Sequence, residues 1–140
     1  MMTIQYKFVE FIPDIIEEGI LYVSFEYCTA VHKCVCGCGN EVVTPLSPTD
    51  WELCFNGKTI SLSPSIGNWS FECKSHYWIR KCNIEFAKNW TEKEIRSGRD
   101  NDFKRKKEFY NELGETQERQ WRAEASKLTF WEKLSKLLRL

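Results

Sequence analysis

The first ninety residues of the chain combine short apolar runs with turn-forming residues. The runs are rich in β-branched and aromatic side chains, a composition typical of half-buried strands. Strands are predicted at 6–11, 19–27, 29–32, 41–44, 51–55, 59–62, 70–73, 77–80 and 83–86. We therefore expect this part of the chain to form a small, mainly antiparallel β module.

One turn in this region has a specific signature. Asn56-Gly57 separates the runs 51–55 and 59–62. Asn and Gly both adopt positive φ at low cost, which favours this dipeptide in two-residue hairpin turns. We expect the two runs to pair as a hairpin.

After Trp90 the pattern becomes helical. Thr91-Glu92-Lys93-Glu94 matches a capping box, in which the Thr hydroxyl and the second Glu carboxylate bind free backbone N–H groups of a first helical turn. A helix is expected to begin there. Ser97-Gly98 is expected to interrupt it, and Gly114 to separate two helical segments.

Apolar residues near the C-terminus recur at steps of three or four and so share one helical face. They are Trp121, Ala125, Leu128, Trp131, Leu134 and Leu138. The simpler interpretation packs this stripe on the chain's own β core. The alternative is a docking helix for a partner or a second subunit.

Composition divides the chain at the same place. The 140 residues suffice for one ordinary domain, and the 20 basic and 20 acidic residues cancel. Residues 1–90 hold 7 Lys/Arg against 10 Asp/Glu, while 91–140 hold 13 against 10. We therefore expect an α+β protein, with a β domain at 1–90 and a basic, amphipathic helical tail at 91–140.

Charge and hydropathy exclude several functions. The chain has no excess of basic residues, which argues against a nucleic-acid partner, because binding to phosphates needs such an excess. No run approaches the 18 or so apolar residues of a membrane span, so no membrane association is expected. The first residues lack a basic stretch leading into an apolar segment, and a cytoplasmic location is therefore expected.

The cysteines indicate a metal site. Cys34, Cys36 and Cys38 alternate with small or apolar residues, and Cys73 precedes His76 by three positions. Clustered thiols in a reducing compartment are typical of zinc, which takes four ligands in structural sites. The favoured set is the four cysteines, and the alternative uses His76 in place of one of them. The other cysteines are predicted to lie in the core: Cys28, Cys54 and Cys82.

Two serines are candidate nucleophiles, and the two histidines of the chain are candidate bases. Ser65 lies in 62–69, predicted to be a tight loop, whose Ile66-Gly67-Asn68 amides can face an oxyanion. The simpler interpretation of this loop is a packed turn in which Ser65 binds its own backbone. Ser75 directly precedes His76, a poor pairing in an extended strand because neighbours point to opposite faces. The second histidine is His32.

Four stretches together resemble one small bacterial family, the domain of unknown function 6527. They are TAVHKCVCGCG at 29–39, VVTPL at 42–46, SPSIGNW at 63–69 and CKSHYWI at 73–79. The family accompanies E1-like, E2-like and ubiquitin-like genes in the Bub, or type II Bil, conjugation operons. The resemblance covers about residues 5–96. It implies a zinc-containing serine peptidase that processes or removes the ubiquitin-like protein, and it leaves open which serine acts.

Residue by residue, the family's metal-bearing motifs match Cys34, Cys36, Cys38, Cys73 and His76, and its other polar positions match Ser65, Ser75 and His32. A variant of the enzyme hypothesis has zinc activating water, with Glu72 or Glu41 as base. A different hypothesis is a non-catalytic, zinc-ribbon-like module that recruits the E2-like enzyme or the ubiquitin-like protein through its aromatic residues.

Overall fold

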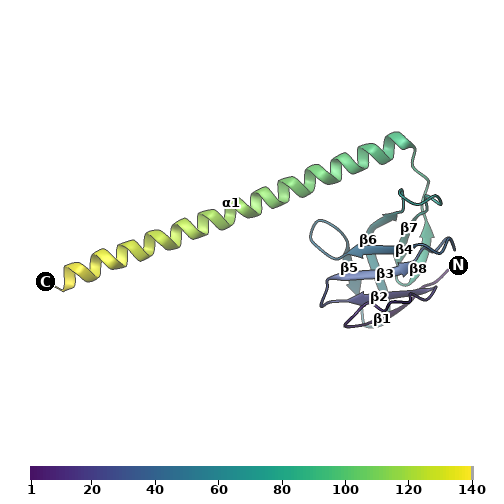
Figure 1. The fold of residues 1–140 in the computed structure, drawn as a ribbon, viewed down its shortest axis with the longest axis horizontal. Coiled ribbons are helices and arrows are strands. Elements are labelled where there is room, and N and C mark those ends of the chain that lie inside the picture. Colours follow the sequence, from purple (N-terminus) through teal and green to yellow (C-terminus); the bar gives the residue numbers. More distant parts are fainter. Residues whose placement is uncertain (140) are drawn as a thin grey trace. The chain divides into compact units, whose positions relative to one another are not determined.

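The computed structural model describes residues 1–139, which form eight strands and one helix (Figure 1). In chain order the elements are β1 (Gln5–Phe8), β2 (Ile20–Ser24), β3 (Thr29–Lys33), β4 (Glu41–Pro45), β5 (Glu52–Phe55), β6 (Ile60–Gly67), β7 (His76–Arg80), β8 (Asn83–Phe86) and α1 (Glu92–Leu138). The predicted fold class, a largely antiparallel β module followed by a helical tail, is confirmed.

The strands form two four-stranded sheets. One has the order β1-β2-β3-β4 and the other the order β5-β6-β7-β8. Only the β1–β2 pair is parallel among the strand pairs of residues 1–139. Consecutive strands are therefore neighbours almost throughout, as short connections favour.

The two sheets share one apolar core. Leu21 and Val23 of β2 pack in the same cluster as Leu62 and Ile66 of β6. Successive side chains of a strand point to opposite faces, so Tyr22 lies on the other face of β2. There it belongs to a second, smaller cluster. β2 is consequently buried on both faces.

The predicted hairpin is present, with a longer connection than the two residues expected. β5 pairs antiparallel with β6 up to Phe55 opposite Ile60, so residues 56–59 form the turn. The Asn56 side-chain oxygen accepts the backbone N–H groups of Lys58 and Thr59, at 2.9 and 2.7 Å. This side-chain closure stabilises a turn of four residues.

The stretch predicted as a tight loop at 62–69 is instead mostly strand, since β6 runs to Gly67. Leu62 and Ile66 face the core on the strand's two-residue period. Pro64 is tolerated because the ladder with β5 ends at Ser63, so no β5 acceptor needs its missing N–H. Ser and Pro in this stretch favour a loop, but the burial of Leu62 and Ile66 stabilises the strand.

The predicted strand at 70–73 is wrong. Residues 69–73 turn and bend, with Phe71 N–H donated to the Asn68 carbonyl and Lys74 N–H to the Phe71 carbonyl, both at 3.1 Å. Lys74 has a positive φ of 43°. This compact turn returns the chain towards β6 and so brings Cys73 to the cysteines that follow β3.

α1 is one continuous helix, so the breaks predicted at Ser97-Gly98 and Gly114 are wrong. The capping box is confirmed, because Thr91 N–H bonds the Glu94 carboxylate at 2.7 Å and Glu94 N–H bonds the Thr91 hydroxyl at 3.3 Å. A single internal Gly costs a helix only about 1 kcal/mol relative to Ala. Neighbouring turns carry ion pairs at i,i+4, which offset that cost.

Most side chains of the apolar stripe of α1 are exposed. Trp121, Leu128 and Trp131 are 73%, 67% and 64% exposed. No helix among residues 1–139 has the length and apolar character that crossing a bilayer demands.

The chain divides into two compact units, Met1–Arg96 and a second that begins at Ser97. The first turn of α1 therefore belongs to the β-rich unit, where Ile95 is buried. Lys74 and Glu92 form an ion pair at 2.7 Å within this unit.

Candidate active site and metal centre

Ser65 and His76 form a hydrogen-bonded pair on neighbouring strands. The Ser65 Oγ lies 2.8 Å from the His76 Nε2. Ser65 comes from β6 and His76 is the first residue of β7. Their distance is that of a nucleophile and its base.

The strand register explains why these two side chains meet. Gly67 is paired with His76, and Ser65 lies two residues earlier on the same face of β6. Ile66 and Tyr77 point to the opposite face, where both are buried in the core. The register between β6 and β7 shifts between Leu62 and Ile66. Such irregularities re-aim side chains near active sites.

The other nitrogen of His76 is held by the backbone. The His76 Nδ1 lies 2.9 Å from the Lys88 carbonyl oxygen. A carbonyl oxygen only accepts, so Nδ1 carries a proton, and in the neutral imidazole Nε2 then has a free lone pair. That lone pair is directed at the Ser65 hydroxyl, which makes His76 competent to take its proton.

Two indole rings enclose the imidazole. The ring centroids of Trp69 and Trp90 lie 5.0 and 5.3 Å from that of His76, both edge-on, and 5.4 Å from each other in a stack. His76 is only 7% exposed. The rings thus restrict the imidazole to one orientation and limit the access of water.

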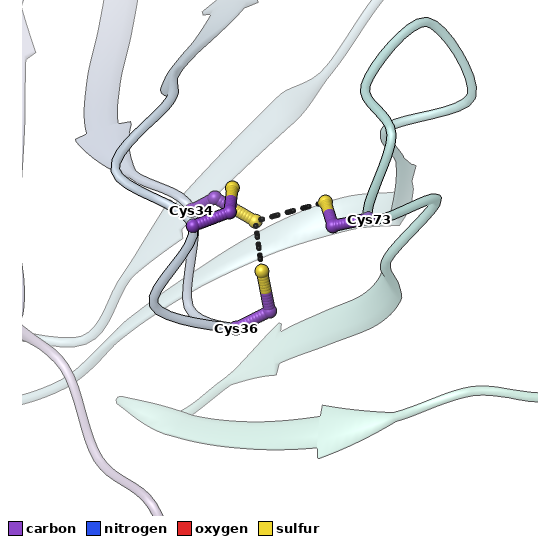
Figure 2. A group of neighbouring side chains, drawn as sticks. Cys34, Cys36 and Cys73 are labelled. Carbon is purple, nitrogen blue, oxygen red and sulfur yellow. Dashed lines mark hydrogen bonds between the residues drawn. The ribbon is translucent and has the colours of Figure 1, made fainter.

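The four predicted cysteines converge. The Sγ atoms of Cys34, Cys36, Cys38 and Cys73 all lie within 4.8 Å of one another. Figure 2 shows the contacts of the Cys34 thiol with those of Cys36 and Cys73, whose Sγ atoms lie 3.4 and 3.9 Å from the Cys34 Sγ. Four thiolates about 2.3 Å from one ion would be spaced similarly, so the cluster can hold a metal ion.

Tight turns bring the sulfurs together. Gly37 and Gly39 have φ of 87° and 82°, values that side chains rarely allow. The Gly37 N–H is donated to the Cys34 carbonyl at 3.1 Å, which closes the first turn. Cys34, Cys36 and Cys38 follow β3 of one sheet, whereas Cys73 lies between β6 and β7 of the other.

The four thiols differ in their surroundings. Burial raises the pKa of the Cys34 thiol. The backbone N–H of Asn40 lowers the pKa of Cys38 to about 7. A bound cation favours the thiolate form of every ligand, so metal binding would deprotonate these thiols.

A model of the family described as bacterial ubiquitination-like system serine protease (BubE) matches residues 8–87, more than half of the chain. The chain belongs to the BubE family. The resemblance drawn from its sequence motifs is thereby confirmed. Searches of curated proteins and of solved structures found no match. The BubE match includes Ser65 and His76, whereas Lys88 and Trp90 lie just beyond it.

His32 of this BubE-family chain lies in a different environment from His76. It is fully buried, and its Nε2 lies 2.8 Å from the Tyr77 hydroxyl. Its Nδ1 has no hydrogen-bond partner among residues 1–139. Burial lowers the pKa of His32 to about 4. The structure therefore gives His32 a tyrosine partner and does not bring it to Ser65.

Ser75 lies beside the cysteines rather than beside an imidazole. Its Oγ is 3.1 Å from the Cys34 Sγ and 2.9 Å from the Asn68 Nδ2. His76 is outside the four-cysteine group, because its two ring nitrogens contact Ser65 and Lys88. In this BubE-family chain the two candidate serines thus belong to two different sites.

Some residues of the site carry no sequence signal. The Lys88 carbonyl is a backbone group, and Trp90 is one of six tryptophans in the chain. The sequence pattern indicates a role for the backbone amide of Asn68 but none for its side chain. The prediction that Cys28 and Cys54 lie in the core is wrong, because both are exposed. Cys28 lies in a turn with φ of 47°, whereas Cys82 does pack against the core.

Proposed function

We propose that this BubE-family protein is a serine peptidase that cleaves the bacterial ubiquitin-like protein of its conjugation system from an extension or a conjugate. Ser65 is the nucleophile, His76 is the base, and a structural zinc ion holds the loops. The observation that carries this proposal is the chain of contacts from the Ser65 hydroxyl through His76 to the Lys88 carbonyl. A nucleophile, a base and a group that orients the base are the elements of serine-type acyl transfer.

In the first step the Ser65 Oγ attacks the carbonyl carbon of the scissile peptide bond while its proton passes to His76 Nε2. His76 then donates that proton to the amide nitrogen, the carbon–nitrogen bond breaks, and the amine leaves. Water attacks the resulting Ser65 ester with His76 again as the base. The acid product leaves and the Ser65 hydroxyl is restored.

The oxyanion needs a hydrogen-bond donor close to Ser65. The Asn68 N–H is donated to the Ser75 carbonyl at 2.9 Å, so that amide is occupied. In antiparallel pairs, hydrogen-bonded and non-hydrogen-bonded positions alternate, so the Gly67 N–H points away from His76 and β7. Of the Ile66-Gly67-Asn68 amides, Gly67 is therefore the donor we assign to the oxyanion.

The cysteine cluster suits a structural ion. Zinc fits the all-thiol set, and four thiolates complete its tetrahedral coordination. A closed site leaves no position for an activated water, which disfavours the variant with Glu72 or Glu41 as base. Glu41 also lies 3.6 Å from Lys33 in an ion pair. When bound, the ion would supply cross-linking of the loops, and the chemistry is left to Ser65 and His76.

The deciding experiment mixes the purified protein with the ubiquitin-like precursor of its operon and reads intact masses over time. The wild type is expected to release the extension, whereas Ser65→Ala and His76→Gln are inactive. Ser63→Ala is the matched control, because Ser63 is an exposed serine on the same strand. Cleavage by Ser65→Ala at the wild-type rate would overturn the assignment of the nucleophile.

The alternative hypothesis, a non-catalytic recruiting module, predicts the opposite result. It would form a stable complex with the ubiquitin-like protein or the E2-like enzyme and yield no product during long incubation. The same samples, passed over a size-exclusion column, separate the two outcomes.

A further inference from the structure

Asn68 and Ser75 form a buried polar pair between the cysteine cluster and the β6–β7 strands. They are 8% and 7% exposed. The Asn68 Nδ2 lies 2.9 Å from the Ser75 Oγ and 3.8 Å from the Cys34 Sγ. The Ser75 Oγ lies 3.1 Å from the Cys34 Sγ and 3.5 Å from the Cys73 Sγ. This pair is not needed as a nucleophile or a base.

The hydrogen bonds in this pair have a defined direction. The amide nitrogen of Asn68 only donates, so the Ser75 Oγ accepts from it. The Ser75 hydroxyl proton is then free to point at Cys34, the nearest sulfur. A metal-bound cysteine is a thiolate, and donors to a thiolate stabilise its charge.

The same two residues are tied to the Ser65–His76 pair through the backbone. The Asn68 N–H is donated to the Ser75 carbonyl at 2.9 Å. Ser75 immediately precedes His76, and Asn68 immediately follows Gly67, the strand partner of His76. Displacement of Ser75 would therefore displace His76 as well.

We propose that Asn68 and Ser75 are positioning residues that donate hydrogen bonds to the metal-bound Cys34 thiolate and so couple metal retention to the position of His76. The claim about metal retention depends only on the cysteine cluster and its contacts. The claim about the position of His76 rests on the proposed function. Groups that hydrogen-bond to metal ligands commonly change metal affinity by about 10- to 100-fold when removed.

The test measures the rate of zinc release from the zinc-loaded full chain to a coloured chelator. Ser75→Ala and the isosteric Asn68→Asp, which removes the amide donor, are expected to release zinc at least about tenfold faster than the wild type. Ser75→Thr keeps the hydroxyl and is expected to release zinc at close to the wild-type rate. Ser24→Ala is the matched control, because Ser24 is a fully buried serine whose hydroxyl bonds the Glu10 carbonyl.

Wild-type release rates in both Ser75→Ala and Asn68→Asp overturn the inference, as does a wild-type chain that takes up no zinc. If Ser75→Ala does not fold, Asn68→Asp and Ser75→Thr decide the outcome. In the precursor assay, Ser75→Ala is expected to lower kcat with little change in KM, and Ser75→Thr to restore it. A wild type that retains zinc but cleaves nothing refutes the proposed function and leaves the zinc result standing.

Discussion

At the scale of single residues, the packing of Trp69 requires a glycine at position 67. A Cβ built on Gly67 would lie 2.5 Å from two indole atoms of Trp69. The ring therefore lies directly against the β6 backbone, next to the imidazole that it contacts. The absence of a side chain at Gly67 is thus required for the enclosure of His76.

Gly67→Ala is accordingly expected to lower the free energy of unfolding by about 1–3 kcal/mol, since overpacking forces the ring to move. It is also expected to lower kcat because Trp69 contacts His76. The matched control is Gly114→Ala, where a Cβ meets no atom within 4 Å. That change is expected to stabilise α1 by about 1 kcal/mol. Thermal unfolding followed by circular dichroism measures both, and stabilisation by Gly67→Ala would contradict the packing argument.

Trp90 offers a second test at this scale. Trp90→Ala removes one of the two rings that restrict His76, and kcat is expected to fall by up to about 100-fold, the effect of a small misplacement of a catalytic group. Trp90→Phe is expected to retain much of the activity. Trp121→Ala, at a residue 73% exposed, is the control. Equal cleavage rates for Trp90→Ala and Trp121→Ala in the precursor assay would show that Trp90 does not contribute to the position of His76.

At the scale of elements, the connection between β8 and α1 supplies two parts of the site. It carries the Lys88 carbonyl and the Trp90 ring, and it is anchored at both ends. At one end the Ala87 N–H is donated to the His76 carbonyl at 2.8 Å. At the other end Glu92 pairs with Lys74, and Ile95 is buried.

Truncation tests the role of this connection. A chain ending after Arg96, the end of the first compact unit, is expected to fold, bind zinc and cleave the precursor. A chain ending after Phe86 lacks Lys88 and Trp90 and is expected to lose cleavage. Zinc content and precursor cleavage are measured for both. Full activity of the shorter chain would show that the Lys88 carbonyl does not orient His76.

At the scale of the whole β-rich unit, the cysteine cluster joins the two sheets. Three of its cysteines follow β3 of the first sheet, and Cys73 precedes β7 of the second. A metal ion there would cross-link segments far apart in the chain. Such binding energy contributes directly to folding.

The purified protein is therefore expected to contain about one zinc ion per chain, and Cys36→Ser to lose both zinc and stability. Cys54→Ser is the matched control, because Cys54 is an exposed cysteine outside the cluster. Zinc analysis and urea unfolding with and without chelator measure the effect. A metal-free chain as stable as the zinc-loaded one would contradict the structural role of the ion.

Several of these features were predictable from local pattern. Most strand positions, the capping box at Thr91 and the convergence of four cysteines depend on side-chain type and spacing along the chain. The predictions were wrong where packing against neighbouring elements determines the local structure. The stretch at 62–69 contains loop-forming residues, yet Leu62 and Ile66 are buried as a strand. Gly114 predicts a helix break, but a single glycine is tolerated within the long helix α1.

The amino-acid sequence by itself determined the β-rich and helical regions, the four cysteines that cluster and the small set of serines and histidines available for chemistry. It left open which serine meets which histidine, because that depends on the register of β6 against β7. The tertiary structure placed Ser65 with His76, Ser75 with Cys34 and His32 with Tyr77. It also brought in the Lys88 carbonyl, since a backbone acceptor acquires a partner only when distant segments fold together.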